Sequence, residues 1–340
     1  MMPLWTARDA AVATGGLSAA DWMATGVSID TRSLSAGDLF VALRGPNHDG
    51  HDFVAAALAR GAAAAVVDRD IPDLPMAAPL LRVADTLAGL AALGAAARGR
   101  SSARVIAVTG SVGKTGTKEA LRLALAACGP TFASAGGLNN HWGAPLSLAR
   151  TPPAAAYGIF ELGMNHPGEI GVLTRVVRPH VAVITTVEPA HLGFFPSLEA
   201  VADAKAEIFL GLEPGGIAVL NRDNRHFDRL SAAAMRAGAA EIIGFGTHRE
   251  ATVRLVDCVL GPRSSTIEAA LPGAVLRFAL PLPGRHWAMN SLAVLAAVAA
   301  AGADPRRAAE ALVVLEALPG RGLRSELSWG GGKLTLIDES

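Results

Sequence analysis

The sequence has little cysteine, no excess of charge of either sign and no long hydrophobic run. Its two cysteines, Cys128 and Cys258, lie far apart and outside any CxxC spacing. This usage argues against a disulfide framework and a thiolate zinc site, and it fits a reducing cytoplasm. The 30 basic residues balance the 30 acidic ones, so the chain offers no global field for nucleic acid or an anionic membrane.

Signals for secretion and membrane insertion are also missing. The first residues, MMPLWTARDAAVATGG, have no basic start followed by an apolar run, so they do not indicate a signal peptide. Alanine-rich runs at residues 91–97 and 292–301 are interrupted or too short to span a bilayer, and they indicate buried helices. With 51% hydrophobic and 18% charged residues, the chain is not expected to be intrinsically disordered. Because it has no run that could span a bilayer, we expect a soluble protein.

The length of 340 residues predicts two or three domains. Residues 25–70 indicate a small α/β unit, with GDLFVAL and AAAVVD as strands on either side of the helical HDFVAAALARGA. The proline-rich IPDLPMAAPLL is typical of a connector, and an alanine-rich helix follows at residues 84–100. We therefore place a first domain at residues 1–84.

From residue 104 onwards, short apolar runs alternate with helical segments. The runs RVIAVT, YGIFELG, HVAVITTV, GIAVLN and EIIGFG are separated in this way. The alternation predicts an α/β fold with parallel strands, right-handed crossovers and a doubly wound sheet, in a second domain at residues 85–316. VRLVDCVL, STIEAAL and AVLRFAL predict an antiparallel appendage, and a helix at about 287–301 closes the domain.

The final segment, LSWGGGKLTLIDES, predicts the beginning of one new strand. A folded domain does not normally end on its first strand. We therefore expect residues 317–340 to begin a third domain whose remainder lies outside this sequence.

The stretch VIAVTGSVGKTGT, residues 105–117, is the most informative motif. Gly110 stands three residues before Gly113, whereas the common nucleotide-binding loop, G-x-x-x-x-G-K-[ST], places its glycines five apart. A buried strand, free glycines and a helix starting near Lys114 would still form a phosphate cradle, and Thr115 could offer its hydroxyl to magnesium. The alternative is an ordinary glycine turn between a strand and a helix.

Two further candidates follow other predicted strands of the same sheet. Glu161 ends GIFEL, and His191 lies in the loop after VAVITT. Ligands of open parallel sheets bind at the carboxyl ends of the strands, so loop, carboxylate and imidazole could converge. Magnesium prefers oxygen ligands and shares them with substrate phosphates. Taken singly, either residue could be structural.

Three other candidates have an ordinary explanation as well. Lys205 is one of four lysines, but its helix LEAVADAKAEIF, with acidic neighbours, is typical of a solvated charged face. NNHWGAP, at residues 139–145, presents two amides and an imidazole, or a turn before proline. His286 and Asn290 share one helical face, where they could meet a base or cap neighbouring backbone.

Together these pieces resemble the Mur ligases. The motifs that carry the resemblance are, in order, DTRSLSAGDLFVALRGPNHDGHDF, TGSVGKTGTK, NNHWGAPLSL, ELGMNHPGEI, EPAHLGFFPSLEAVADAKAEIF, LNRDN, LPLPGRHWAMNSLAVLAA and PGRG. They cover nearly the whole chain from about residue 25. ELGMNHPGEI is most similar to the branch that adds D-alanyl-D-alanine to UDP-N-acetylmuramoyl-tripeptide. The resemblance implies a monomeric, cytoplasmic, ATP-dependent ligase of peptidoglycan precursor synthesis that works through an acyl phosphate.

The resemblance also implies roles for individual residues. The short loop would hold ATP through Gly110, Ser111, Val112, Gly113, Lys114, Thr115 and Gly116. Further nucleotide contacts would come from His286, Asn290, Arg321 and Asp338. Two magnesium ions would be held by Thr115, Glu161, His191 and Lys205, the last converted by carbon dioxide to an anionic carbamate. The catalytic set would be Lys114, Lys205, His191 and Asn140, with Asn140 near the phosphates. The UDP end of the substrate would be held by Thr31, Arg32, Asn47, His48 and Asp49.

The sequence departs from the family pattern in two places. Trp287 follows the histidine of GRH where asparagine is usual, so an indole could stack on the purine instead. Family members also continue beyond LIDES into a C-terminal Rossmann-like domain that helps bind ATP and the amine, and we expect this chain to lack it.

Three other functions are compatible with parts of the pattern. One is the sister ligase that adds the third amino acid of the peptide, and a second is a truncated, non-catalytic nucleotide-binding module. The third, a P-loop kinase or GTPase, would need the longer glycine loop and a separate acidic metal motif, and neither is evident.

Overall fold

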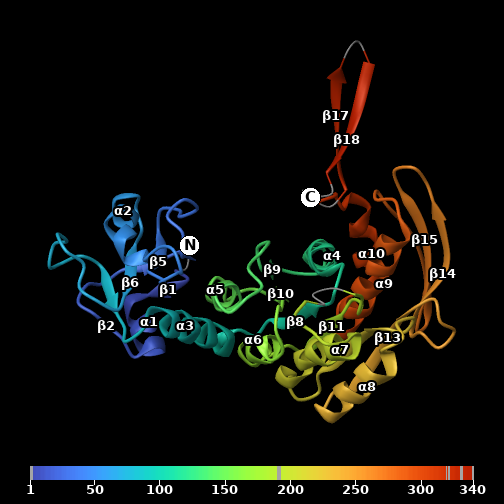
Figure 1. The fold of residues 1–340 in the computed structure, drawn as a ribbon, viewed down its shortest axis with the longest axis horizontal. Helices are drawn as coiled ribbons and strands as arrows, with labels where there is room; N and C mark the ends of the chain where they lie inside the picture. The colour runs from blue at the N-terminus through green and yellow to red at the C-terminus, as the bar shows by residue number, and fades with distance from the viewer. Residues whose placement is uncertain (1–2, 190–192, 319, 321, 330–331, 339–340) are drawn as a thin grey trace.

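The structure, a computed structural model, consists mainly of two sheets joined by a long helix (Figure 1). It describes residues 3–189, 193–318, 320, 322–329 and 332–338. Figure 1 shows the smaller sheet in the N-terminal part, and α3 (Thr86–Arg100) runs from there towards the larger sheet. Within these described ranges, no helix combines the length and the apolar character needed to cross a bilayer.

The smaller sheet has five strands in the order β2-β7-β6-β5-β4. Strands β4 to β7 pair in parallel, and β2 pairs antiparallel with β7. Leu39 and Val41 face one apolar cluster and Phe40 faces another, so the sheet is buried on both faces. The elements of this part are β1 (Trp5–Thr6), α1 (Ala7–Thr14), β2 (Leu17–Ser18), β3 (Met23–Ala24), β4 (Gly26–Ser28), β5 (Asp38–Val41), η1 (Gly50–Phe53), α2 (Val54–Ala59), β6 (Ala64–Val67) and β7 (Leu80–Arg82).

The larger sheet has nine strands in the order β16-β15-β14-β13-β12-β11-β8-β10-β9. All neighbours from β9 to β14 pair in parallel, and β14, β15 and β16 pair antiparallel. Its strands are β8 (Arg104–Thr109), β9 (Thr131–Ala133), β10 (Tyr157–Glu161), β11 (Val181–Ile184), β12 (Ile217–Asn221), β13 (Glu241–Gly246), β14 (Val253–Leu260), β15 (Ser265–Leu271) and β16 (Ala274–Leu280). The predicted mostly parallel sheet with an antiparallel extension is confirmed.

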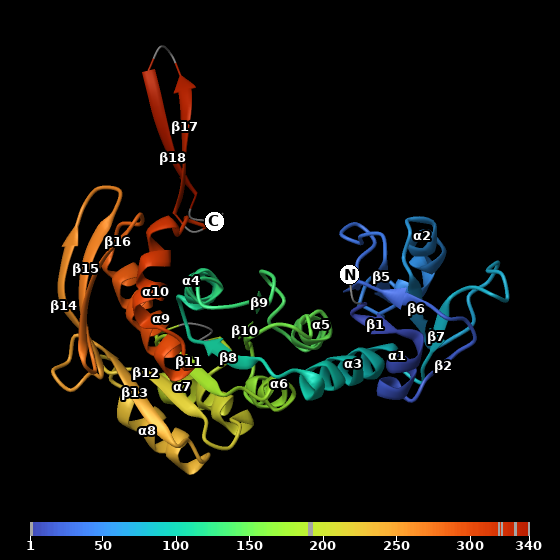
Figure 2. The same cartoon turned by 180° about the vertical axis from the view of Figure 1, so that it is seen from behind.

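Helices cover both faces of the larger sheet (Figure 2). Ile106 and Val108 of β8 belong to one core cluster, whereas Val105 and Ala107 belong to the other, as period-two alternation requires. The first cluster includes α4, α9 and α10, and the second includes α5 to α8. The helices are α4 (Lys114–Ala126), α5 (Gly143–Ala149), α6 (Glu169–Val177), α7 (Leu198–Ala206), η2 (Glu207–Gly211), α8 (Phe227–Arg236), α9 (Arg285–Ala300), α10 (Pro305–Ala311) and η3 (Leu312–Val314). This is a doubly wound arrangement.

Hydrogen bonds from buried or half-buried side chains hold the two sheet units together. The Trp5 indole donates to the carbonyl of Ala149 at 2.9 Å. Arg150 donates to the carbonyl of Val27 at 2.6 Å in the opposite direction. Because Leu146 and Ala149 also share the apolar cluster of the N-terminal part, α5 packs as part of both units.

Two expectations for local structure need correction. The last segment was expected to form one strand, but β17 (Leu323–Trp329) and β18 (Gly332–Asp338) form an antiparallel hairpin that projects from the body (Figures 1 and 2). The proline turn expected at the end of NNHWGAP is a helix, because Pro145 lies in the first turn of α5, where no intrahelical N–H is needed.

Candidate functional site

The glycine loop lies at the carboxyl end of β8, between Thr109 and the first residue of α4. Gly113 adopts φ +83°, a left-handed conformation that favours glycine. Lys114 folds back over the loop, and its Nζ donates to the carbonyls of Gly110 at 2.8 Å and Ser111 at 3.3 Å. The loop therefore combines a tight glycine turn, a helix N-terminus and an ammonium group, as its sequence predicted.

Helix α9 approaches this loop so closely that two glycines are required. A Cβ on Gly113 would lie 2.9 Å from Oδ1 of Asn290, and a Cβ on Gly116 would lie 2.9 Å from Cη2 of Trp287. Trp287 is itself buried in the core. The indole of Trp287, which could stack on a purine, thus packs against the glycine loop.

A cavity of about 570 Å³, which we call the loop cavity, is lined by the glycine loop, α9 and the base of the hairpin. Its lining residues are Ser111, Val112, Gly113, Lys114, Gly116, Leu282, Pro283, His286, Trp287, Asn290, Ala317, Gly320, Gly322 and Ile337. Most residues expected at a nucleotide site therefore meet here. Gly110 and Thr115 stand beside the cavity without lining it, and Arg321 lies outside the described residues.

Asp338 stands near this cavity as part of the hairpin base. Its Oδ2 accepts the N–H of Gly320 at 2.7 Å, and its carbonyl accepts the N–H of Gly322 at 2.7 Å. Both glycines line the loop cavity. Asp338 thus shapes the cavity wall, and its role as a nucleotide contact stays a prediction.

A second cavity, of about 490 Å³, shares Lys114 with the first. We call it the amide cavity; its lining residues are Lys114, Asn139, Asn140, His141, Gly163, Met164, Asn165, Glu169, Val172 and Leu173. The predicted Asn140 lies here, but its Oδ1 accepts the N–H groups of Trp142 at 3.1 Å and Gly143 at 2.9 Å. Its amide therefore caps the start of α5.

Asn139 is the residue that sequence reasoning missed. Its Nδ2 donates to Oε1 of Glu161 at 3.0 Å. A Cβ on Gly163 would lie 2.9 Å from the Asn139 amide carbon, so glycine at 163 gives this amide its space. The paired asparagines of NNHWG were a signal that this segment carries amides, but no spacing rule distinguishes which of the two reaches the carboxylate.

Glu161 is a buried carboxylate at the end of β10, with 5% of its surface exposed. Its Oε1 accepts from Asn139, whereas its Oε2 is buried without a hydrogen-bond partner. A buried carboxylate oxygen without a partner is costly, and a cation is the partner that would satisfy it. The geometry therefore fits a metal ligand.

Lys205 is buried inside α7, with 2% of its surface exposed. Burial, and then the charge of Lys114, lower the pKa of the Lys205 amine from 10.5 to about 7. The spacing predicted that Lys205 lies on a solvated charged face of its helix, and this prediction is wrong. Its neighbours point elsewhere, because Asp203 pairs with Arg229 at 2.7 Å and Glu207 accepts N–H groups at the start of α6.

His191, the remaining predicted ligand, lies outside the described residues. In the part of the chain that the structure describes, no three His, Cys, Asp or Glu side chains cluster as a metal site would require. Two of the predicted metal ligands, Thr115 and Lys205, are not His, Cys, Asp or Glu, so the absence of such a cluster does not bear on them. The ligand set as a whole stays a prediction.

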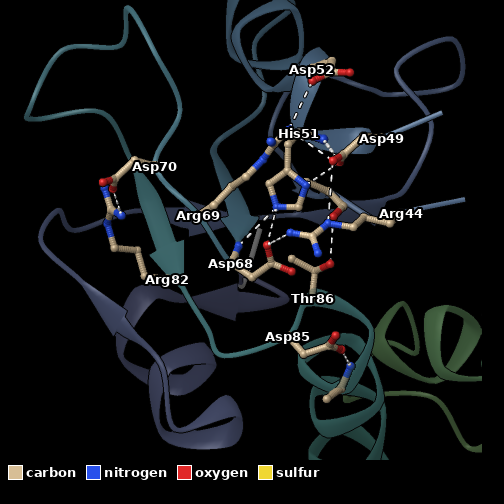
Figure 3. A network of polar contacts seen from close by, with 12 residues as sticks. Arg44, Asp49, His51, Asp52, Asp68, Arg69, Asp70, Arg82, Asp85 and Thr86 are labelled. Carbon is tan, nitrogen blue, oxygen red and sulfur yellow. Dashed lines mark hydrogen bonds and ion pairs between the residues drawn. The ribbon is translucent and has the colours of Figure 1, made fainter.

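A third cavity, of about 530 Å³, lies in the N-terminal part, and we call it the N-terminal cavity. Thr31, Arg32, Asn47 and His48 line it as expected of substrate-binding residues, together with Trp142 from the other sheet unit. Asp49 is the exception. Its carboxylate turns into a polar network with His51, Arg44 and Arg69 (Figure 3).

Two stretches of the chain match models of known protein families. Residues 108–298 match the model of the Mur ligase middle domain, and residues 24–101 match the model of the Mur ligase family, catalytic domain. The chain belongs to the Mur ligase family. The first match contains the glycine loop, Glu161, Lys205 and α9 up to residue 298. The second contains the residues that line the N-terminal cavity, except Trp142.

Several Mur ligases resemble most of the chain. It is 38% identical over 314 residues to the UDP-N-acetylmuramoyl-tripeptide--D-alanyl-D-alanine ligase of Escherichia coli, covering 91% of this chain and 68% of that protein. A crystal structure of MurF from Acinetobacter baumannii superposes with a TM-score of 0.84 at 31% identity, covering 99% of this chain and 73% of that one. MurF from Thermotoga maritima, solved in complex with ADP, superposes with a TM-score of 0.75 at 27% identity, covering 93% and 70%.

Proposed function

We propose that this protein is an ATP-dependent ligase that joins D-alanyl-D-alanine to UDP-N-acetylmuramoyl-tripeptide. One observation carries the proposal: the loop cavity and the amide cavity meet at Lys114, so a nucleotide in one and a carboxylate in the other would face the same ammonium group. Its relatives in Escherichia coli and Acinetobacter baumannii carry this activity in their names. The chain itself thus supplies places for both reacting anions.

The loop cavity is the proposed ATP site. The backbone N–H groups from Gly110 to Gly116 would receive phosphate oxygens, and Lys114 would exchange the loop carbonyls for them. His286 and Asn290, together with Trp287, would receive the base and ribose from α9. Arg321 and Asp338 would add contacts from the hairpin side.

Magnesium fits the donor set on one side of this site. The unpartnered Oε2 of buried Glu161 and the half-buried hydroxyl of Thr115 are oxygen donors of the kind this ion prefers. A second ion would be held with Glu161 by His191 and a carbamylated Lys205. At pH 7 about half of the Lys205 amine is neutral when its pKa is about 7, and the neutral amine is the form that reacts with carbon dioxide. Bound magnesium would neutralise phosphate charge.

The proposed reaction has two steps, and each step forms one bond and breaks another. The terminal carboxylate of the tripeptide attacks the γ-phosphorus of ATP, the bond to ADP breaks, and an acyl phosphate forms. The amino group of D-alanyl-D-alanine then attacks the carbonyl carbon and loses a proton, and phosphate leaves with its bonding electrons. Because the first step brings two anions together, Lys114 between the two cavities would reduce their repulsion.

The N-terminal cavity is the proposed site for the UDP end of the substrate. Thr31, Arg32, Asn47 and His48 offer polar groups there, and Arg32 is held by a 2.7 Å ion pair to Asp30. Both members of this pair are exposed, so a diphosphate could replace Asp30 at little cost. We propose no direct contact for Asp49, which was expected in this set.

We also propose the domain boundaries and setting that the sequence suggested. Residues 1–84 would form the domain for the nucleotide substrate, residues 85–316 the ATP-binding domain, and residues 317–340 the beginning of a third domain of the Rossmann-like kind. We place the reaction in the cytoplasm, carried out by a monomer without nucleic acid, because its substrates are nucleotide-linked precursors of the cell wall.

A phosphate-release assay tests the proposal with protein expressed from its complete gene. We expect release that requires ATP, magnesium, the tripeptide nucleotide and D-alanyl-D-alanine together. Release only with the dipeptide nucleotide plus a diamino acid would assign the sister ligase that adds the third amino acid. Binding of ATP and substrate with no release would assign a non-catalytic module.

A further inference from the structure

The loop between β5 and η1 forms one wall of the N-terminal cavity. Gly45, Pro46, Asn47 and His48, at its tip, all line the cavity. The tip is closed by a hydrogen bond from the N–H of Gly45 to the carbonyl of His48, at 2.9 Å. The direction in which the tip presents Asn47 and His48 therefore depends on what holds the base of the loop.

Four side chains form a ring at that base (Figure 3). Nδ1 of His51 lies 2.6 Å from Oδ1 of Asp49, and its Nε2 accepts the N–H of Asp68 at 3.2 Å. Arg44 closes the ring from the other side, with Nη2 2.6 Å from Oδ1 of Asp68 and Nε 3.6 Å from Oδ2 of Asp49. The ring thus ties both legs of the loop to the end of β6.

His51 is the buried centre of this ring, with a side chain that is 0% exposed. Its Nδ1 faces Oδ1 of Asp49, and its Nε2 lies 3.2 Å from both the backbone nitrogen and Oδ1 of Asp68. Arg44 pairs with Asp68 and Arg69 pairs with Asp49, so each carboxylate also has an arginine partner. Both nitrogens of the buried imidazole therefore have a polar partner within the ring.

Asp49 links this ring to the backbone of the loop. Its Oδ1 also accepts the N–H of His51 at 3.0 Å and so caps η1. Burial opposes ionisation of Asp49, but the backbone and imidazole N–H groups of His51, with the charge of Arg69, outweigh it and lower the pKa of Asp49. The legs also touch directly, because a Cβ on Gly50 would lie 2.7 Å from backbone atoms of Leu43.

We propose that His51 is a positioning residue for substrate binding: it holds the loop at residues 43–50 so that Asn47 and His48 face the N-terminal cavity. His51 does not line the cavity, so it acts through the loop and not by contact with the ligand. The identity of that ligand, the nucleotide end of the muramyl peptide substrate, rests on the proposed function. The positioning itself rests on the ring.

Substitutions at position 51 separate the two halves of the ring. His51→Asn keeps a donor near the Nδ1 position and loses the acceptor for Asp68, whereas His51→Gln reaches the Nε2 position and loses the donor to Asp49. His51→Ala removes both. Arg82→Ala is the matched control, because it breaks the ion pair to Asp70 in the same unit, away from the loop (Figure 3).

Steady-state kinetics are the first readout. Losing a hydrogen bond to a charged group corresponds to roughly a tenfold change in affinity. We therefore expect His51→Ala to raise KM for the tripeptide nucleotide about tenfold, with a smaller rise for Asn or Gln. The kcat and the KM for ATP should stay within about twofold of wild type, as for Arg82→Ala. An unchanged KM with a kcat lowered in proportion to the folded fraction would mean that His51 only stabilises the unit, which overturns the proposal.

Hydrogen exchange of the free protein is the second readout and needs no substrate. Amides of residues 43–51, among them Gly45 and Gly50, should exchange faster in His51→Ala than in wild type and Arg82→Ala, while α4 stays protected. Unchanged exchange in this segment overturns the proposal. If wild-type protein fails to turn over the tripeptide nucleotide, the proposed function falls, and hydrogen exchange alone then decides the positioning role.

Discussion

Replacing Lys205 by methionine should make the free protein more stable and the enzyme inactive. Methionine has nearly the length of lysine without the amine, so the buried position stays filled. Lys205 has 2% of its surface exposed, and no hydrogen bond of its amine is found with the residues that the structure describes. The wild-type side chain therefore costs folding free energy that only its function explains.

The magnitude follows from the pKa of Lys205. Burial, and then the charge of Lys114, lower it from 10.5 to about 7. The folded value lies below the unfolded one, so the unfolded chain binds more protons between pH 7 and 10.5, and wild-type stability rises with pH across this window. At roughly 1.36 kcal/mol per pKa unit, the cost at pH 7 is about 4 kcal/mol. The cost disappears above pH 10.5.

Urea unfolding of the free protein measures this cost. Wild type and Lys205→Met are compared at pH 7 and pH 10 in buffer with EDTA and without carbon dioxide, so that neither metal nor a carbamate contributes. We expect the variant to gain up to about 4 kcal/mol at pH 7 and much less at pH 10. Phosphate release by the same variant should fall to background.

A second buried lysine provides the control. Lys118 is also fully buried, but its Nζ donates to the carbonyl of Ser134 at 2.7 Å and lies 3.0 Å from Glu119. Lys118→Met should therefore destabilise the protein by about 1–3 kcal/mol, because both partners lose their donor. If Lys205→Met were also destabilising at pH 7, or if its gain were the same at pH 10, the reasoning would be refuted.

Three further substitutions test other parts of the site and the sheet. Asn139→Ala removes the 3.0 Å hydrogen bond to Glu161, and we expect Mn²⁺-dependent ADP binding to weaken about tenfold by calorimetry. Equal loss in metal-free ADP binding would contradict the assignment. Gly113→Ala places a Cβ 2.9 Å from Oδ1 of Asn290 at φ +83° and should raise the Kd for ADP at least about tenfold. An unchanged Kd for ADP would contradict the close approach of Gly113 to Asn290. Burial, and then neighbouring arginines, lower the pKa of His180 from 6.5 to about 4, so stability should fall as pH drops below 6.5. His180→Gln should flatten that fall, and an identical acid profile would show that other groups cause it.

Much of the fold could be predicted because its signals are local. The alternation of apolar runs with helical segments predicted the parallel strands, and the glycine at position 61, with φ +92°, ends α2 as expected. The prediction for the last segment was wrong for a physical reason. Whether residues 323–338 form one strand or a hairpin depends on pairing between two β-prone runs, which composition alone leaves open.

In the candidate site, too, local features could be predicted from the sequence, whereas contacts between separate segments could not. Residues next to the glycine loop in sequence, such as Lys114, were predictable from the loop itself. Which asparagine reaches Glu161 and which caps α5 was decided by the direction in which residues 139–143 enter that helix. The family resemblance grouped Asp49 with the substrate residues, but His51 and two arginines turn its side chain away from the cavity.

The sequence by itself determined the order of strands and helices, the glycine loop and the set of side chains that could act, because these depend on residue types and their spacing. Only the tertiary structure decided which of them meet. Packing of α7 and α9 against the larger sheet buries Lys205 and brings Asn290 over Gly113. Burial and distance, which change pKa values and close cavities, arise between segments far apart in the chain, and no local pattern encodes them.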